Sequence, residues 1–273
     1  MAFPANLSER VVEAMREVAN EIILPRFQHL ATADVEEKSP GELVTIADKE
    51  SERVLTMRLK DILPGSTVIG EELAEIQPEV VDRVGKGTVW LVDPLDGTSN
   101  FVAGKALFSV MVSLVVDGET QLGLMLNPVT GVLHHAELGA GAFRDGERLR
   151  AFDGALPLGE LRGSILNRLL PPDLKADLAG RANGLKANLP GFGCAGVEYP
   201  AIVENDQHFA LFWRSLPWDH APGTLFVREA GGVARRLNGE EYRPEDRSKG
   251  LIIACNEAVY EEVCTKLIGR GAW

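Results

Sequence analysis

Residues 90–101 read Trp-Leu-Val-Asp-Pro-Leu-Asp-Gly-Thr-Ser-Asn-Phe, a short apolar run that ends in two aspartates three positions apart. A carboxylate at the end of a buried strand costs free energy unless it is paired or holds a cation. Gly97 lets the backbone approach a ligand closely, and the three polar residues after it are common at helix starts. The stretch therefore offers oxygen ligands for a cation beside N–H groups for an anion. This combination suits a phosphate bound together with Mg²⁺.

Two other acidic segments support the same chemistry. Residues 68–72 read Val-Ile-Gly-Glu-Glu, an apolar strand that ends in Glu71 and Glu72. Residues 218–223 read Trp-Asp-His-Ala-Pro-Gly and precede an apolar helical run. Three such segments in one chain predict a site assembled from distant parts of the sequence. Glu72 is expected to be a solvated neighbour of Glu71 rather than a second ligand.

Taken in order, these motifs resemble the inositol monophosphatase family of Mg²⁺-dependent, lithium-sensitive phosphatases. The resemblance rests on Gly-Glu-Glu at 70–72, on residues 90–101, on Trp-Asp at 218–219 and on Glu-Ala-Gly-Gly at 229–232. Residues 43–48, Leu-Val-Thr-Ile-Ala-Asp, also look like the family's helix start. The similarity spans about Lys38 to Gly232. It implies an α+β fold, the layered αβαβα sandwich of the inositol monophosphatase and fructose-1,6-bisphosphatase type.

The resemblance implies two to three Mg²⁺ ions as cofactors. Glu71, Asp93 and the backbone carbonyl of Leu95 would hold the first ion. Asp93, Asp96 and Asp219 would hold the second, with Asp93 bridging the two. A third and weaker ion would contact Glu71 through waters.

The resemblance also implies how water is activated. The Thr98 hydroxyl, oriented by Asp48, would position and deprotonate the attacking water together with Glu71, and no covalent phosphoenzyme would form. The N–H groups of Gly97 and Thr98 would hold the phosphate oxygens. Lys38, in the expected loop at residues 38–41, matches a family lysine on a mobile loop near the metals.

Substrate contacts are expected from several segments, and two of them depart from the family pattern. Phe212 stands where inositol-specific members have a glutamate that binds ring hydroxyls, and phenylalanine cannot accept a hydrogen bond. Arg214 could instead face a second anionic group, and Cys194 replaces the hydroxyl of a Gly-Ser-Ala turn. The full set of expected phosphate and substrate contacts is Asp96, Gly97, Thr98, Gly193, Cys194, Ala195, Phe212, Arg214 and Asp219.

The amino-acid composition limits the kinds of partner and the cellular location that we expect for the protein. The chain has 273 residues, 45% of them hydrophobic, and a formal net charge of −12. An acidic chain does not favour direct nucleic-acid binding through a basic surface. The three cysteines lack metal-ligand spacing and predict reduced thiols in a cytoplasmic protein. Residues 11–30 mix charges with apolar residues, so neither a signal peptide nor a membrane span is expected there.

The pattern of elements predicts two halves of one catalytic unit. Residues 1–152 would form an N-terminal half with a meander of antiparallel strands, and residues 153–273 a C-terminal half that carries Asp219. Asp48 is expected to start a helix, Ala221 to begin another, and residues 191–193 to form a short strand. By resemblance the protein is expected to be a homodimer.

The expected function is a phosphomonoesterase that hydrolyses a small phosphorylated metabolite, an inositol monophosphate or a related ester. The missing glutamate at position 212 leaves other esters open: 3′-phosphoadenosine 5′-phosphate, fructose 1,6-bisphosphate and histidinol phosphate. A different class of function is a regulatory interaction protein that retains the fold. The full set of acidic motifs favours the enzyme.

Overall fold

The computed structural model describes residues 4 and 6–269 and builds them from helices and strands in alternating layers. The helices are α1 (Leu7–Val18), α2 (Ile46–Ile62), α3 (Glu71–Ile76), α4 (Thr98–Val102), α5 (Pro172–Ala182), α6 (Ala195–Val203), α7 (Pro217–Glu229) and α8 (Glu257–Glu262). The first strands are β1 (Val35–Ser39), β2 (Glu42–Thr45), β3 (Thr67–Gly70), β4 (Thr88–Asp96), β5 (Ser109–Val116), β6 (Glu119–Leu126), β7 (Leu133–Glu137), β8 (Gly141–Arg144) and β9 (Glu147–Leu149). The later ones are β10 (Arg162–Leu166), β11 (Ala187–Leu189), β12 (Phe209–Phe212), β13 (Val233–Arg236) and β14 (Leu251–Ala254).

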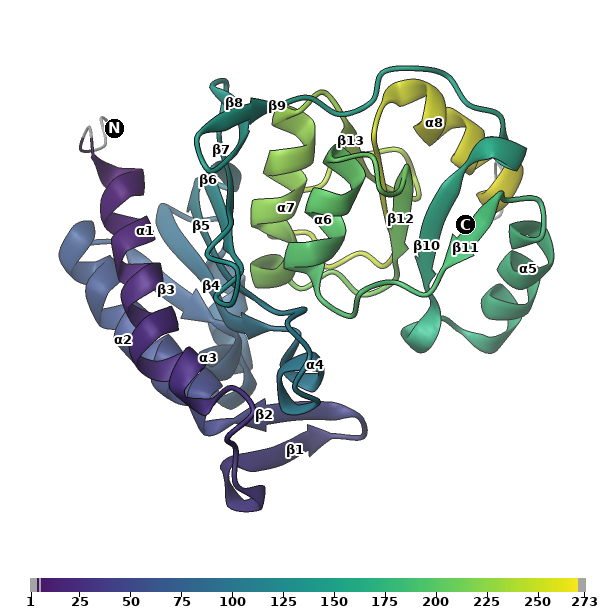
Figure 1. Cartoon of the computed structure of the whole chain (residues 1–273). Helices are drawn as coiled ribbons and strands as arrows, with labels where there is room; N and C mark the ends of the chain where they lie inside the picture. Colours follow the sequence, from purple (N-terminus) through teal and green to yellow (C-terminus); the bar gives the residue numbers. More distant parts are fainter. Residues whose placement is uncertain (1–3, 5, 270–273) are drawn as a thin grey trace.

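The strands form two large sheets and one hairpin. The first sheet has seven strands in the order β3-β4-β5-β6-β7-β8-β9, and the second has five in the order β11-β10-β12-β14-β13. Helices α1 and α2 cover the outer face of the first sheet, and α6 and α7 lie between the two sheets (Figure 1). Helices α5 and α8 lie on the far side of the second sheet (Figure 1). The expected αβαβα sandwich is therefore confirmed.

Strand β4 is buried on both faces and joins the two hydrophobic cores. Trp90 and Val92 pack into the core with α1 and α2, whereas Val89 and Leu91 pack into the core shared with α6, α7 and the second sheet. This division follows from the two-residue period of a strand, which sends successive side chains to opposite faces. A continuous apolar run is therefore what this central position requires.

A bulge ends the regular pairing of β4. Asp93 pairs with Met111 and Asp96 with Ser109, so two residues of β4 face one of β5 between them. Pro94 lies in the bulge, where a residue without an N–H can be tolerated in a sheet. The bulge changes the direction of the last residues of β4, and Asp93 and Asp96 lie on either side of it.

Several predicted element boundaries differ from the structure. The helix expected from Asp48 begins two residues earlier, and the helix expected from Ala221 begins at Pro217. The predicted strand at 191–193 is wrong: Gly191 and Gly193 have φ of +75° and +68°, a left-handed conformation that suits a turn. The antiparallel meander is present as β5 to β8.

The division into residues 1–152 and 153–273 stays a prediction. Strands β3 to β9 belong to the first sheet and strands β10 to β14 to the second, so the sheets change near the expected boundary. Helix α7 nevertheless packs against β6 and β7 of the first sheet, and the cores merge across that contact. No helix in the described part of the chain is long and apolar enough to cross a membrane.

Candidate active site

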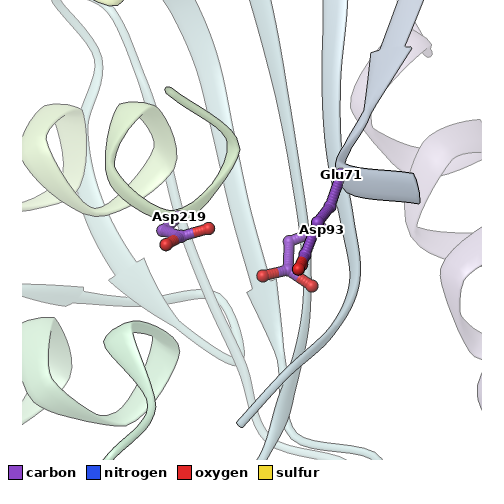
Figure 2. Close-up of side chains that lie close together, drawn as sticks. All are labelled: Glu71, Asp93 and Asp219. Carbon is purple, nitrogen blue, oxygen red and sulfur yellow. The ribbon is translucent and has the colours of Figure 1, made fainter. Parts of the chain in front are cut away.

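Three carboxylates from distant segments meet in one pocket. Glu71 comes from the first turn of α3, Asp93 from the end of β4 and Asp219 from the first turn of α7. One carboxylate oxygen of each lies within 4.8 Å of the others, and their side chains converge in Figure 2. The pocket has a volume of about 620 Å³, a size typical of small-molecule sites.

The electrostatics of this cluster suit a bound cation. Burial, followed by the charge of Glu71, raises the pKa of both Asp93 and Asp219 well above the usual range. Like charges held together away from water disfavour ionisation, unless a cation offsets them. Carboxylate oxygens are the ligands that Mg²⁺ prefers. The donor set of Glu71, Asp93 and Asp219 therefore fits a divalent cation.

Asp96 lies outside this group of three. Its Oδ2 accepts hydrogen bonds from the Gly196 N–H (2.6 Å) and the Cys194 thiol (3.0 Å), both at the start of α6. Burial raises the pKa of Asp96 to about 6. The carboxylate thus ties the first sheet to α6, and its expected contact with a metal stays a prediction.

Thr98 and Asp48 are in contact, although fifty positions separate them. Thr98 Oγ1 lies 3.0 Å from Asp48 Oδ1 and 3.0 Å from the carbonyl oxygen of Leu95. Asp48 Oδ2 accepts from the N–H (2.8 Å) and hydroxyl (2.6 Å) of Thr45, which begins α2 in a capping box. Asp48 therefore caps the start of α2 with one carboxylate oxygen and contacts the Thr98 hydroxyl with the other. Burial raises its pKa to about 7.

Lys38 lies in β1, so its expected place in a loop is wrong. Pairing with β2 extends the strand through Ser39. The Lys38 Nζ lies 3.2 Å from Glu71 and 2.5 Å from Glu72, and its side chain is only 11% exposed. Burial lowers the pKa of Lys38, but the two glutamates raise it more, so the ammonium stays charged. The expectation that Glu72 is solvated is also wrong, because Glu72 is buried and paired with Lys38.

Glu52 is a buried residue of the site that the motifs missed. From α2, its carboxylate accepts hydrogen bonds from the N–H groups of Glu72 (2.7 Å) and Leu73 (2.8 Å) and so caps the start of α3. A Cβ at position 70 would lie 2.2 Å from the Glu52 carboxyl, so Gly70 leaves the room for this contact. The signal was present: Glu52 is four residues after Asp48 and three before Leu55, on the buried face of the helix.

The expected substrate residues line the same pocket. Gly97, Gly193, Cys194, Ala195, Phe212 and Arg214 all contribute to its walls. Gly97 has φ of +88°, and a Cβ there would lie 2.8 Å from the Leu107 carbonyl, so only glycine suits this position. Phe212 is stacked on Tyr199 with ring centroids 5.5 Å apart, which fixes it as a wall of the pocket. Whether these residues contact substrate stays a prediction.

Comparison with known proteins places the chain in a family. The model of the inositol monophosphatase family matches residues 5–270. The fructose-1,6-bisphosphatase/inositol-1-monophosphatase of Thermotoga maritima is 30% identical over 92% of both chains. The Nus factor SuhB of Escherichia coli strain K12 is 30% identical over 84% of both chains. The solved IMPase structure from Thermotoga maritima aligns over 94% of both chains, with 26% identity and a TM-score of 0.78. The chain belongs to the inositol monophosphatase family.

Proposed function

We propose that the protein is a Mg²⁺-dependent phosphomonoesterase that hydrolyses a small phosphorylated metabolite by direct attack of water. The observation that carries the proposal is the convergence of Glu71, Asp93 and Asp219 within 4.8 Å of one another beside the pair of Thr98 and Asp48. The 30% identity to a fructose-1,6-bisphosphatase/inositol-1-monophosphatase over nearly the whole chain supports it.

The three clustered carboxylates would hold the metal, with the Leu95 carbonyl and Asp96 as the further proposed ligands. Bound Mg²⁺ supplies charge neutralisation at the phosphate and lowers the pKa of water. Asp93 is shielded from solvent and Asp219 is half-buried, and a low exposure strengthens the interaction of a carboxylate with a cation. Glu71 is the most open of the three, with a side chain 32% exposed.

Water activation is assigned to Thr98 and Glu71. When Thr98 donates its hydroxyl proton to Asp48, its oxygen lone pairs are free to accept a hydrogen bond from water. Glu71 faces the pocket and can accept the proton that this water loses. The water oxygen bonds to phosphorus as the bond to the ester oxygen breaks. The leaving alkoxide takes up a proton from solvent water, and Glu71 releases its proton to solvent.

A covalent route through Cys194 is disfavoured. Its thiol is buried and donates to Asp96, and burial followed by the Asp96 charge raises its pKa well above the usual value. Because the thiolate is the nucleophilic form, such a thiol is a poor nucleophile. Direct hydrolysis by water is therefore the route that these residues support.

Phosphate release from a panel of esters, with Mg²⁺ and then with EDTA, tests the proposal. The panel holds inositol 1-phosphate, 3′-phosphoadenosine 5′-phosphate, fructose 1,6-bisphosphate, histidinol phosphate and glycerol 2-phosphate. We expect release that depends on Mg²⁺, with one ester preferred. A preference for inositol 1-phosphate would show that Phe212 does not exclude polyols.

No release from any ester would favour the other class of function, a regulatory interaction protein. The similarity to proteins named Nus factor SuhB keeps this alternative open. A pull-down that yields one stoichiometric partner would then support it. The homodimer, lithium sensitivity, cytoplasmic location and absence of direct nucleic-acid binding remain predictions.

A further inference from the structure

Two arginines and one glutamate meet at the wall of the active-site pocket, a group that we name the arginine clasp. Glu42 lies in β2, Arg168 in the 3₁₀ turn after β10, and Arg214 in the segment between β12 and α7. Glu42 Oε1 accepts from Arg214 Nη1 at 2.5 Å and from Arg168 Nη2 at 3.4 Å. All three residues line the pocket that holds Glu71, Asp93 and Asp219.

The charges of the arginine clasp do not cancel. Two guanidinium groups share a single carboxylate, which leaves one positive charge in an otherwise acidic pocket. Glu42 is itself held in its charged form: burial raises its pKa, but Arg214 and the other partners lower it more. Arg214 and Asp219 line the same pocket. The surplus charge is therefore adjacent to the carboxylate cluster and not on a remote surface.

Both arginines keep donors for another acceptor. Within the described part of the chain, the Arg214 side chain makes one hydrogen bond, from Nη1 to Glu42, and is 34% exposed. Arg168 also donates to the Gly41 carbonyl (2.9 Å) and is 59% exposed. Since a guanidinium has five N–H donors, each can bind a second anion without leaving Glu42.

The remaining wall of this part of the pocket is apolar. It is formed by side chains without hydroxyl or carboxylate groups, namely Ile165, Leu166, Leu169, Leu189, Phe212 and Trp213. Hydroxyl groups placed against these side chains would lose hydrogen bonds to water and gain none from them. This apolar wall favours an alcohol with an apolar body over a polyol.

We propose that the substrate is a phosphate monoester whose alcohol carries a second anionic group, a phosphate or a carboxylate, which Arg168 and Arg214 bind. This inference rests on the proposed phosphatase function and names its substrate class. The phosphate to be cleaved lies at the carboxylate cluster, and the apolar wall receives the body of the alcohol.

Matched substrate pairs test the inference. The first pair is 3′-phosphoadenosine 5′-phosphate and adenosine 3′-monophosphate, which differ by a second phosphate. The second pair is 2-phosphoglycerate and glycerol 2-phosphate, which differ by a carboxylate. We measure the ratio of kcat/KM within each pair and expect about 10- to 100-fold in favour of the doubly anionic member, the range typical of a charge-assisted hydrogen bond. The pair with the larger ratio identifies the anion.

Variants of the arginine clasp show which of its residues produce the ratio of kcat/KM within each substrate pair. Arg168→Gln and Arg214→Gln should each lower the ratio about tenfold. Glu42→Gln removes the competing carboxylate and should raise it. Arg243→Gln is the matched control, because Arg243 is an exposed arginine with a side chain 65% accessible, paired only weakly with Glu245. This control should keep the ratio of the unmodified protein.

The two proposals fail in different ways. Turnover of both members of each pair at equal efficiency, or an equal loss on both in the arginine variants, would overturn the inference and leave the phosphatase intact. In the latter case the arginines would only anchor the β1–β2 hairpin. No phosphate release from any compound would overturn the proposed function and the inference with it.

Discussion

Asp93 is the most buried carboxylate of the cluster and lies among several like charges. It is 3% exposed, and the charges of Glu71, Asp96 and Asp219 all act to raise its pKa, after the larger effect of burial. Stability alone does not explain such a residue, because a buried unpaired charge costs free energy. The proposed cation would offset this charge.

Asp93→Asn should therefore lower turnover by about 10³-fold, because it removes a charged ligand while preserving shape. The fold should persist, since the substitution takes one charge out of a repelling cluster. We would measure Mg²⁺-dependent phosphate release together with thermal unfolding. Asp82→Asn is a suitable control, because Asp82 is an exposed aspartate paired with Arg247. Full activity in the Asp93 variant would contradict the metal assignment.

Thr98→Val tests the hydroxyl that contacts Asp48. Valine has nearly the same shape but cannot donate, so kcat should fall about 100-fold and one buried Asp48 oxygen loses a partner. The free energy of unfolding should also fall, by about 1–3 kcal/mol. Thr98→Ser keeps the hydroxyl and should recover most of both losses. A valine variant with unchanged kcat would limit Thr98 to a structural contact.

At this scale, the sequence predicted the residues that carry motifs and missed those that support them. Glu71, Asp93, Thr98 and Asp219 were expected, and the structure brings them into one pocket. The spacing of Glu52 marks it as buried on α2, but its role was missed because its partners are backbone N–H groups of another helix, which leave no trace in residue spacing. Glu42 was missed for a similar reason, since its arginine partners are more than 120 positions away.

At the scale of elements, the junction of β3 and α3 depends on close packing against α2. Gly70 has φ of −108°, a conformation open to any residue, so backbone freedom does not explain the glycine. The explanation is the Glu52 carboxyl, which would lie 2.2 Å from an added Cβ.

Gly70→Ala should therefore force Glu52 away from the start of α3 and destabilise the protein by about 1–3 kcal/mol, as overpacking typically does. Activity should fall as well, because Glu71 lies in the same turn. Chemical unfolding and phosphate release would measure the two effects. Gly180→Ala is the matched control: Gly180 lies in α5 with nothing within 4 Å of an added Cβ, and alanine there should stabilise by about 0.5–1 kcal/mol. Equal behaviour of the two variants would rule out the packing argument.

Element types were easier to predict from the sequence than their ends. The central strand was recognised from its apolar run, but its continuation to Asp96 depends on a bulge opposite β5. Helix α7 was placed four residues late, because Pro217 at its first position tolerates a helix start while Pro222 inside it resembles a break. Packing between distant segments decides where these elements begin and end, and the local sequence carries no signal of that packing.

At the scale of the whole molecule, the site lies where the two sheets and their helices meet. Glu71 and Asp93 come from the first sheet and the helix after it, while Asp219 comes from α7 between the sheets (Figure 1). The sequence pattern suggested only mixed layers of helix and strand. The order of the layers was expected from the family resemblance, because contacts between distant strands have no local signal.

We expect this arrangement to couple the free energy of folding to pH and to metal binding. Burial raises the pKa of Asp48 and Glu52 to about 7 each, above the value of about 4 expected in the unfolded chain. Between those values the folded protein holds protons that the unfolded chain has lost, so stability falls as pH rises through this window. The raised pKa values of Asp93 and Asp219 act in the same direction.

Burial lowers the pKa of His220 to about 3 and also lowers the pKa of His135 and His208, and these groups act in the opposite direction below about pH 6. Four raised carboxylates outweigh them, so the metal-free protein should be more stable near pH 5 than near pH 8. Mg²⁺ should reverse this, because it binds the ionised cluster and not the protonated one. We expect Mg²⁺ to raise Tm by about 5 °C near pH 8 and by much less near pH 5, measured by thermal unfolding with Mg²⁺ and with EDTA. In the Asp93→Asn variant the gain near pH 8 should shrink. An equal Mg²⁺ effect at both pH values would show that metal binding is not linked to ionisation of these carboxylates.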